Sequence, residues 1–343
     1  MRDLTVLHVV GSPTSRFWFD LSLLYAAPVV RPAGFRALFA VAYPSGEWAL
    51  GARLDAPSER LSLAEFLTRL PRVDLVVPHL FCPAGLAAVR DLFEVVLGLP
   101  LVGSPAAVLR VAQDKHLTRL VAAAAGVRVP AGVVLEPGDG VEVGLGFPVI
   151  VKPATADNSD GLALVQTPAE LPAALAAAFA FGRRALVEAF VPGREIRGAV
   201  VERNGRLETL AYIEYGVSAA HPVRFAANKL RVDDGGALVG QERESAIAAV
   251  CPAVLAPALR DELGAMMTAM HRALGCRDFS LYDFRVHAGT GMPVLLEAGL
   301  FWSFGPLSMV SQMLAASGLD LDAVAVEVWQ AAAGRGARRT GAQ

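Results

Sequence analysis

The sequence predicts an α/β fold, with a mostly parallel sheet in the first hundred residues and antiparallel strands further on. Three observations carry this prediction. Apolar strands alternate with helical patterns up to about residue 100, strand segments follow one another directly between residues 183 and 215, and a long helix precedes two final strands. Strands that alternate with helices indicate a parallel sheet covered by helices, whereas strands joined by short turns pair antiparallel.

The expected elements follow in chain order. In the first part, strands are expected at 4–11, 35–43 and 73–81, and helices at 61–70 and 83–98. The middle part contains a broken helix, a strand, and then a strand–loop–strand–helix unit, at 104–126, 127–139 and 146–182. After the antiparallel segment come a helix, two strands and a last helical stretch, at 257–275, 279–289, 293–300 and from about Ser308.

The composition is that of a compact folded protein. Of 343 residues, 54% are hydrophobic and 19% charged, and the net charge of −2 leaves no basic excess for nucleic acid. No apolar run reaches the roughly 18 residues of a membrane span, and the apolar start fits a strand better than a signal peptide. Cys82, Cys251 and Cys276 are far apart and odd in number, which favours a cytoplasmic location without disulfides.

Lysine is rare enough to mark individual positions. Only three of the 31 basic residues are lysines, namely Lys115, Lys152 and Lys229. An ammonium is a compact point charge, so lysines retained in an arginine-rich chain are candidates for contacting a phosphate. The alternative is that these three lysines remain by chance.

The segment PVIVKPATADNSDG places Lys152 at the end of an apolar strand, before a small polar loop. The ammonium and the free backbone N–H groups of such a loop can hold a polyphosphate. The spacing differs from the G-x-x-x-x-G-K-[ST] pattern, so a P-loop enzyme is not expected. A surface hairpin with a solvated lysine is the alternative.

Two glutamates flank the Pro-Gly turn of LVEAFVPGREI, namely Glu188 and Glu195. A strand that runs into a connecting loop offers N–H and C=O groups to an adenine edge, and an acid beyond the turn can accept hydrogen bonds from ribose hydroxyls. Ordinary surface glutamates are the alternative.

The strand FSLYDFRV and the strand PVLLEAG carry the most specific pattern. Alternation places Asp283 and Arg285 on one face of the first strand and Glu297 and Gly299 on one face of the second. If the strands pair, the two carboxylates converge as hard oxygen ligands for Mg²⁺ held with nucleotide phosphates. Arg285 can then stabilise a transferring phosphoryl group. A structural Asp–Arg pair is the alternative.

Histidine and cysteine patterns argue against other chemistries. The six histidines lack metal-ligand spacing, so zinc is not expected, and there is no G-x-S-x-G nucleophile elbow. His79 lies in a loop after a strand, where α/β sheets bind ligands, although a packed histidine is the alternative. Cys82 is expected to be a small buried hydrophobe.

In this order the segments resemble the D-alanine–D-alanine-ligase-like branch of the ATP-grasp superfamily. The resemblance runs from LVGSPAA at Leu101 to the last helix, through QDK, PVIVKP, LVEAFVPGREI, DF and LLEAG. It implies an ADP-forming, C–N bond-forming ligase that uses ATP and two Mg²⁺ ions. It also implies a three-domain ATP-grasp fold, α+β in its ATP-grasp part, after an N-terminal Rossmann-like domain. The implied parts are 1–104 (before the ATP-grasp), 105–192 (central), 193–335 (C-terminal, with the magnesium strands) and 336–343 (a frayed tail).

The resemblance also implies roles for individual residues. Asp283 and Glu297 bind magnesium, and the residues expected to act in catalysis are Arg285, Lys152 and Lys229. Those expected to contact ATP are Lys115, Lys152, Ser159, Glu188, Phe190, Val191, Glu195, Lys229 and Leu296. Those expected to contact the other substrates are Ser15, Arg16, His79, Trp302, Ser303 and Ser308.

Two departures from ordinary D-alanine–D-alanine ligases stand out. Leu281 occupies the position of an arginine that stabilises an oxyanion, and Gly299 that of an asparagine at the second magnesium. With these departures, the chain resembles the ligases that attach a second amino acid to mycosporine-glycine. The segments that carry this resemblance are GCRDFSLYDFRV, LLEAGLFWSFGPLSMVSQMLAASG and HVVGSPTSRFWFDLSLLYA. An aromatic cluster, Phe301, Trp302 and Phe304, follows Glu297; some of these rings are expected to face the flat substrate ring, and core packing is the alternative.

The subgroup implies that ATP phosphorylates the ring carbonyl oxygen of mycosporine-glycine. The amine of serine, threonine or alanine then attacks, and phosphate leaves to give an imine, as in ultraviolet-absorbing products of the shinorine and porphyra-334 type. The nearest alternative is a dipeptide or amide ligase that acts through an acyl phosphate. A nucleotide-binding regulator without turnover is a further one. Small molecules are the only expected partners, apart from a second copy in a homodimer; nucleic acid and membrane are not expected.

Overall fold

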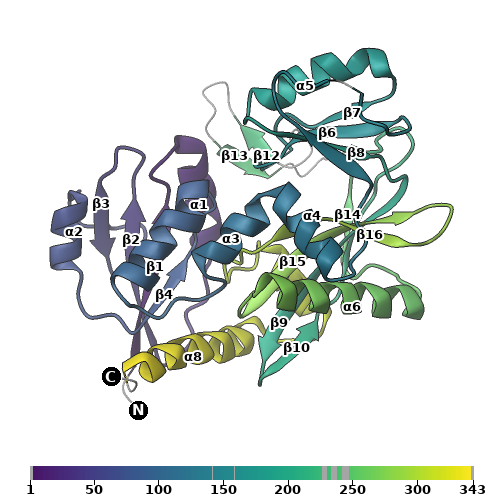
Figure 1. The fold of residues 1–343 in the computed structure, drawn as a ribbon. Coiled ribbons are helices and arrows are strands. Elements are labelled where there is room, and N and C mark those ends of the chain that lie inside the picture. The colour runs from purple at the N-terminus through teal and green to yellow at the C-terminus, as the bar shows by residue number, and fades with distance from the viewer. Residues whose placement is uncertain are drawn as a thin grey trace.

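A computed structural model of the chain describes residues 3–140, 142–157, 159–225, 230–232, 238–241 and 247–340, of which 230–232, 238–241 and 337–340 are described as backbone only. The described strands form four sheets (Figure 1). A four-stranded sheet at the left of the view belongs to the start of the chain, a second lies at the upper right, and a six-stranded sheet lies below it. The fourth sheet has only two strands, β12 (Leu230–Val232) and β13 (Leu238–Gln241).

The first sheet has the strand order β3-β2-β1-β4. Its central strand β1 pairs parallel with β2 and β4, which confirms the predicted mostly parallel sheet. The edge strand β3 pairs antiparallel with β2, and no strand was expected at its position in the sequence. The strands are β1 (Leu4–Gly11), β2 (Phe35–Ala42), β3 (Trp48–Gly51) and β4 (Leu75–Pro78).

Helices cover both faces of this sheet, which is why the run LTVLHVVG of β1 is apolar and almost wholly buried. Ser15 caps the first helix, and a capping box of Ser62 and Glu65 begins the second. The helix expected at 83–98 is confirmed as one continuous helix over residues 83–96, which contains two π-helical stretches. The elements are α1 (Arg16–Ala26), α2 (Leu63–Arg69), η1 (Gly85–Val89) and η2 (Leu92–Val96).

The predicted broken helix is two helices that meet at Asp114. The Asp114 carboxylate accepts hydrogen bonds from the backbone N–H groups of His116 (3.0 Å) and Leu117 (3.1 Å), and this cap starts the second helix. The elements are α3 (Ala106–Gln113) and α4 (Lys115–Ala124). As a consequence, the side chain of Lys115 stands at the first position of a helix.

The second sheet has the strand order β5-β8-β6-β7, and all of its pairs are antiparallel. It has an apolar core of its own, closed on one side by α5. The elements are β5 (Gly132–Leu135), β6 (Val149–Pro153), β7 (Ala163–Val165), η3 (Pro168–Glu170), α5 (Leu171–Phe179) and β8 (Ala185–Ala189).

The six-stranded sheet is antiparallel, with the order β14-β11-β9-β15-β16 and with β10 paired to β9. The predicted pairing of the last two strands is confirmed, since Asp283 lies directly opposite Glu297. The strands are β9 (Gly193–Arg203), β10 (Arg206–Thr209), β11 (Ile213–Tyr215), β14 (Ala249–Val250), β15 (Phe279–His287) and β16 (Pro293–Gly299).

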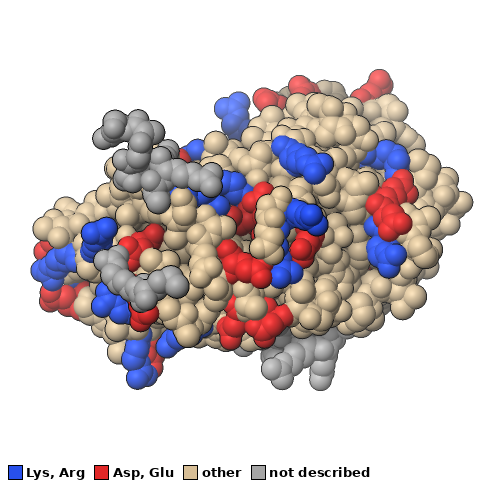
Figure 2. Space-filling view, turned by 90° about the horizontal axis from the view of Figure 1, so that it is seen from below, with Lys and Arg blue, Asp and Glu red and all other residues tan. Residues whose placement is uncertain are grey.

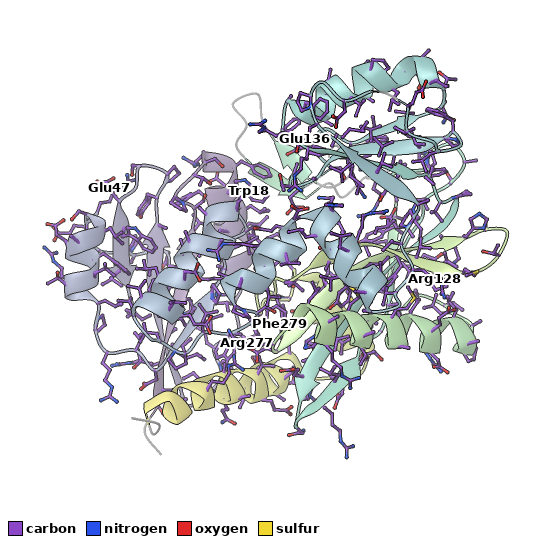
Figure 3. The ribbon with its side chains drawn as sticks, viewed as in Figure 1. Trp18, Glu47, Arg128, Glu136, Arg277 and Phe279 are labelled. Carbon is purple, nitrogen blue, oxygen red and sulfur yellow. The ribbon has the colours of Figure 1, made fainter. Side chains whose placement is uncertain are left out.

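Three further helices complete the described chain: α6 (Pro257–Leu274), α7 (Met309–Ala316) and α8 (Leu321–Thr340). One apolar core runs from β1 through β9 and β15 to α7 and α8, so the first sheet and the six-stranded sheet share it. Phe279 and Arg277, at the start of β15, lie where the two meet, above α8 (Figure 3). The helix α8 reaches residue 340, within the segment expected to be frayed. The division into domains remains a prediction.

On the face shown in Figure 2, acidic and basic side chains are interspersed with uncharged surface. None of the described helices alone has the length and apolarity of a membrane span; α7 and α8 pass such a test only together, as a pair bent by 118°.

Candidate active site

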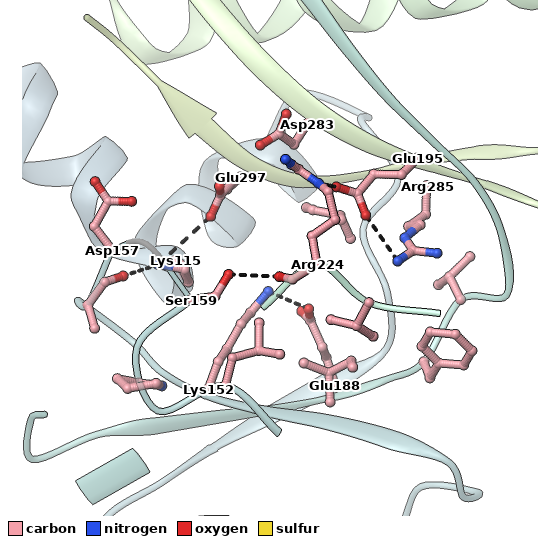
Figure 4. Close-up of a pocket in the computed structure, with 18 of the residues that line it drawn as sticks. Lys115, Lys152, Asp157, Ser159, Glu188, Glu195, Arg224, Asp283, Arg285 and Glu297 are labelled. Carbon is pink, nitrogen blue, oxygen red and sulfur yellow. Dashed lines mark hydrogen bonds and ion pairs between the residues drawn. The ribbon is translucent and has the colours of Figure 1, made fainter. Parts of the chain in front are cut away.

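A cavity opens between the second sheet and the six-stranded sheet (Figure 4). Every described residue expected to contact ATP or magnesium, or to act in catalysis, lines it: Lys115, Lys152, Ser159, Glu188, Phe190, Val191, Glu195, Asp283, Arg285, Leu296 and Glu297. Lys229 lies outside the described residues. Residues of these sequence patterns, which are spread over almost two hundred positions, therefore lie together in one cavity of the fold.

Lys152 and Glu188 form a buried ion pair at the base of the cavity. They stand on the neighbouring strands β6 and β8, and the ammonium Nζ lies 2.5 Å from the Glu188 Oε1. The other carboxylate oxygen accepts a hydrogen bond from Arg119 at 3.1 Å. Glu188 is thus held between two cations, which offsets the cost of burying its charge. The pair fixes Lys152 in the cavity, so a solvated surface lysine is excluded.

Lys115 enters the cavity from the start of α4. Its backbone N–H donates to the Ala154 carbonyl (2.8 Å), and its ammonium donates to the carbonyl of Ala156, so that the helix start is joined to the loop after β6. The same ammonium lies 3.9 Å from the Glu297 Oε2 (Figure 4). A positive charge thus stands between the polar loop and Glu297 of β16.

Asp283 and Glu297 converge as the strand alternation predicted, because they are direct partners on β15 and β16. On the other side, β9 places Arg197 opposite Asp283. The Arg197 guanidinium donates to both Asp283 oxygens, at 2.5 and 2.6 Å. Burial raises the pKa of the Asp283 carboxyl, and the charge of Arg197 opposes that rise.

Arg285 does not stand free in the cavity. Its guanidinium lies 3.0 Å from the Glu195 carboxylate and donates to the carbonyls of Pro222 (2.6 Å) and Gly193 (3.2 Å). Glu195 also accepts a hydrogen bond from Arg224 at 2.6 Å. Burial lowers the pKa of Arg285, and the charge of Glu195 opposes this effect. Two arginines thus share one buried acid at the end of the cavity opposite Lys115.

The polar loop after β6 closes over the cavity with a left-handed turn. Ser159 has φ 67°, and its hydroxyl donates to the Arg224 carbonyl at 3.1 Å. Gly161 follows with φ 68°. Glycine adopts positive φ without steric cost, so it suits such a turn.

The residues expected to contact the other substrates do not line this cavity. Ser15 and Ser308 occupy the N-cap positions of α1 and α7. The Arg16 side chain is largely exposed and pairs with Asp20. His79 is buried, with its Nε2 3.0 Å from the His8 Nδ1, and the burial lowers its pKa to about 3.

The expectation that Trp302 faces a substrate ring is wrong. Its side chain is 2% exposed and donates from Nε1 to the Ser311 hydroxyl at 2.9 Å. It stacks on Phe304, also buried, with ring centroids 3.9 Å apart. Ser303, between them, is buried as well. Of the aromatic cluster, only Phe301 reaches the surface, at 37% exposure.

Comparison with known proteins decides the family. Residues 135–329 match the family model described as the D-Ala–D-Ala ligase C-terminus. A D-alanine–D-alanine ligase of Mycolicibacterium smegmatis is 31% identical over 318 residues, which cover 90% of this chain and 79% of that protein. A D-alanine–D-alanine ligase of Geobacter sulfurreducens is 32% identical over 240 residues, which cover 68% of this chain and 69% of that protein. The chain belongs to the D-alanine–D-alanine ligase family.

Solved structures agree on the fold. The D-alanine–D-alanine ligase of Coxiella burnetii superposes with a TM-score of 0.78 at 19% identity, covering 99% of this chain and 97% of that one. The VanG D-Ala:D-Ser ligase of Enterococcus faecalis also superposes with a TM-score of 0.78, at 20% identity, and the match covers 95% of this chain and 98% of that one. The predicted ATP-grasp fold is therefore confirmed. The family to which the chain belongs makes it an ADP-forming ligase that forms C–N bonds.

Ligases of this family use ATP and Mg²⁺, and the cavity suits both. Among the described residues no cluster of three or more acidic, histidine or cysteine side chains forms a closed metal site. Mg²⁺ needs no such cluster, because it is commonly held by one or two carboxylates together with substrate phosphates. Asp283 and Glu297 are of the right chemical kind and lie side by side at the cavity, and in this structure Arg197 occupies both oxygens of Asp283. The ion, when bound, neutralises phosphate charge, and Lys115 and Lys152 supply further positive charge nearby.

Among the residues missed in the sequence are three arginines that hold the acids of the site: Arg119, Arg197 and Arg224. Two carried a usable signal. Arg197 lies two residues after Glu195 on one strand, hence on the same face, and Arg119 lies one helical turn after Lys115. Arg224 lies in no regular element, and only the folded chain brings it to Glu195.

Proposed function

We propose that the cavity binds ATP with Mg²⁺ and that this ligase transfers the γ-phosphoryl group to an oxygen of an acceptor. The amine of a small amino acid then attacks the activated carbon, the C–O bond to phosphate breaks, and the amine loses a proton. The observation that supports the residue roles is the convergence of Lys115, Lys152, Asp283 and Glu297 in one cavity. Positioning and charge stabilisation of this kind account for most catalysis of phosphoryl transfer.

The comparisons favour a second amino acid as the acceptor. The relatives reported above are named D-alanine–D-alanine or D-Ala:D-Ser ligases. The activated species would then be an acyl phosphate, and the product a dipeptide. Among the functions expected from the sequence this was the alternative, and it has the broader support.

A second candidate acceptor is mycosporine-glycine, and the six-stranded sheet contains the observation that favours it. Leu281, at the expected arginine position, is 4% exposed and packs in the apolar core, opposite Gly299. Both departures from ordinary D-alanine–D-alanine ligases thus meet at one pair of positions beside Glu297. On this reading the ring carbonyl oxygen is phosphorylated, and amine attack with loss of phosphate gives an imine.

An acceptor assay separates the two candidates. Purified protein is given ATP, Mg²⁺ and either D-alanine alone or mycosporine-glycine with serine, threonine or alanine, and ADP is measured beside the product. Dipeptide formation supports the first candidate, and a red-shifted ultraviolet product supports the second. Absence of ADP in every mixture would contradict the proposed ligase activity.

Two substitutions test the proposed residue roles. Lys152→Ala and Glu297→Ala should each lower the rate of ADP formation by at least about a hundredfold, since each removes a charge from the phosphoryl-transfer site. Glu262→Ala is the matched control, because Glu262 pairs with Arg128 and is not among the residues that line the cavity. Wild-type turnover in Lys152→Ala or Glu297→Ala would remove that residue from the site.

A further inference from the structure

Arg197 is a charged residue beside the site to which the proposed function gives no role. It lies on β9 directly opposite Asp283 of β15, which in turn lies directly opposite Glu297 of β16. Residues paired in this way share one face of a sheet, so the three side chains form one row across three strands. Asp283 and Glu297 line the cavity (Figure 4), whereas Arg197 is not among the residues that line it. An effect of Arg197 on the cavity therefore acts through Asp283.

The contact between Arg197 and Asp283 takes up the whole carboxylate. The guanidinium donates from Nε to one oxygen at 2.5 Å and from Nη2 to the other at 2.6 Å. The side chains are only 19% and 9% exposed, so little water competes for them. Two-pronged pairs of opposite charge are among the strong hydrogen-bonded contacts. A partner that only supports a metal ligand would hold one oxygen and leave the other to the ion, but Arg197 holds both.

The second acid of the row also has a cation close by, because the Lys115 Nζ lies 3.9 Å from the Glu297 Oε2. Two carboxylates thus face two cations in the nucleotide-free protein. A divalent cation gains little at such a balanced site unless further negative charge comes with it. Nucleotide phosphates carry that charge, and Mg²⁺ in proteins is commonly held by carboxylates and phosphates together.

Arg197 has a second neighbour besides Asp283. Its guanidinium carbon lies 5.6 Å from the centre of the Tyr215 ring, on β11. A guanidinium within roughly 6 Å of an aromatic ring is attracted to it. Arg197 therefore keeps a favourable contact when it gives up an oxygen of Asp283.

We propose that Arg197 is a positioning residue that occupies Asp283 in the nucleotide-free protein, so that Mg²⁺ binds there only together with nucleotide phosphates. This assignment rests on the magnesium role proposed above for Asp283 and Glu297, and it identifies the residue that controls access to Asp283. Arg197 also offsets the cost of a buried carboxylate while no metal is bound. Asp283 is thus kept charged and in place until metal and nucleotide arrive together.

Binding of Mn²⁺, as a paramagnetic substitute for Mg²⁺, tests the assignment without reference to turnover. The free ion is measured by electron paramagnetic resonance at pH 8 in nucleotide-free protein. Arg197→Met removes the charge but keeps a long side chain, and it should tighten Mn²⁺ binding by at least about tenfold. Arg197→Lys keeps the charge but cannot hold both oxygens in the same way, so its affinity should lie between the two. The gain should disappear in the double variant Arg197→Met/Asp283→Asn.

Arg203→Met is the matched control. Arg203 ends the same strand, is 15% exposed, and forms a two-pronged pair with Glu327 at 2.8 and 3.0 Å. It is not among the residues that line the cavity. Its removal should leave the Mn²⁺ affinity within about twofold of the wild type, as expected for a site distant from the metal.

Melting temperatures supply a second measurement. Arg197→Met leaves a buried acid without its cation and should be less stable than the wild type. Mg²⁺ alone should then raise the melting temperature of Arg197→Met more than that of the wild type, because the ion binds the folded variant more tightly. A purely structural arginine would lower stability without this gain from the metal. If Arg197→Met does not fold, Arg197→Lys decides by the same two measurements.

The outcomes separate the role of Arg197 from the magnesium site itself. Unchanged or weaker Mn²⁺ binding in Arg197→Met, or in Arg197→Lys where only that variant folds, overturns the role of Arg197. The magnesium site is tested in the wild type, which a non-hydrolysable ATP analogue should stabilise more with Mg²⁺ than without it. If Mg²⁺ adds nothing there, the magnesium role of Asp283 and Glu297 fails, and the assignment of Arg197 fails with it.

Discussion

At the residue scale, the charge of Glu188 illustrates how the site is held. Its carboxylate is 3% exposed and bridges Lys152 and Arg119. Glu188→Ala should lower the free energy of unfolding by about 3–5 kcal/mol, because it leaves two buried cations without their acid. Glu262→Ala, at a half-exposed pair with Arg128, should cost no more than about 1 kcal/mol. Urea denaturation measures both, and equal losses would contradict the view that Glu188 is a structural counter-ion.

A second prediction at this scale concerns pH. Burial holds the pKa of His79 at about 3 and that of its partner His8 well below the ordinary value. In the unfolded chain histidine titrates near pH 6.5, so between pH 6.5 and 3 the unfolded state binds more protons than the folded one. The free energy of unfolding should therefore fall as the pH drops below about 6.5, by up to about 1.4 kcal/mol per pH unit for each histidine.

The quantity to compare is the change of the free energy of unfolding with pH, and not its value at one pH. When this free energy is measured by urea denaturation between pH 6.5 and 5, it should change less steeply with pH in His79→Gln than in the wild type, whatever the stability of the variant at neutral pH. An unchanged slope would mean that His79 does not titrate differently in the two states.

Prediction from sequence succeeded at residues whose role follows from alternation along a strand. Asp283 and Glu297 could be paired because each residue of a strand faces the side opposite to its neighbour. Trp302 could not be placed in the same way, because the segment after β16 is irregular and has no period to follow. The His8–His79 contact likewise depends on the register of β1 and β4, which no local pattern contains.

At the element scale, the start of β9 depends on Gly193. Its φ is +134°, and a Cβ there would lie 2.1 Å from the Val286 carbonyl oxygen on β15. The Gly193 carbonyl also accepts a hydrogen bond from Arg285. Gly193→Ala should therefore destabilise the protein by about 3–4 kcal/mol and lower turnover by displacing Arg285.

Gly205 provides the control for this effect. It also has positive φ, +72°, but a Cβ there would have no atom of the described residues within 4 Å. Gly205→Ala should show the conformational cost alone, about 1–2 kcal/mol, with normal turnover. If the two variants lost the same stability, the close approach of β9 to β15 would not be what requires glycine at position 193.

Elements with strong local signals were predicted well, and elements defined by distant partners were not. The apolar run of β1 and the Asp114 cap of α4 are local features. In contrast, β3 is a short edge strand that exists because β2 pairs with it. The helix expected at 83–98 is present, but its two π-helical stretches could not be predicted, since a helical pattern in sequence does not separate a π-helix from an α-helix.

At the scale of the whole molecule, Asp278 joins three distant segments. Its carboxylate accepts hydrogen bonds from the Gly103 N–H (2.7 Å) and from two nitrogens of Arg335 on α8 (2.7 Å each). The residue is 2% exposed and adopts φ 65°, which aspartate and asparagine tolerate better than most residues. Arg277, next to it, pairs with Glu94 of η2. The contact between the first sheet and the six-stranded sheet is thus polar at this point and apolar in the shared core.

Asp278→Ala should lower the free energy of unfolding by about 3–5 kcal/mol, because Arg335 and a buried N–H lose their acceptor. Asp278→Asn should cost less, since it keeps an acceptor oxygen and suits the left-handed backbone. Because the two sheets share one core, both variants should still unfold in a single transition, followed by tryptophan fluorescence and by circular dichroism in urea. Two separate transitions in Asp278→Ala would show that the carboxylate, and not the apolar core, couples the sheets.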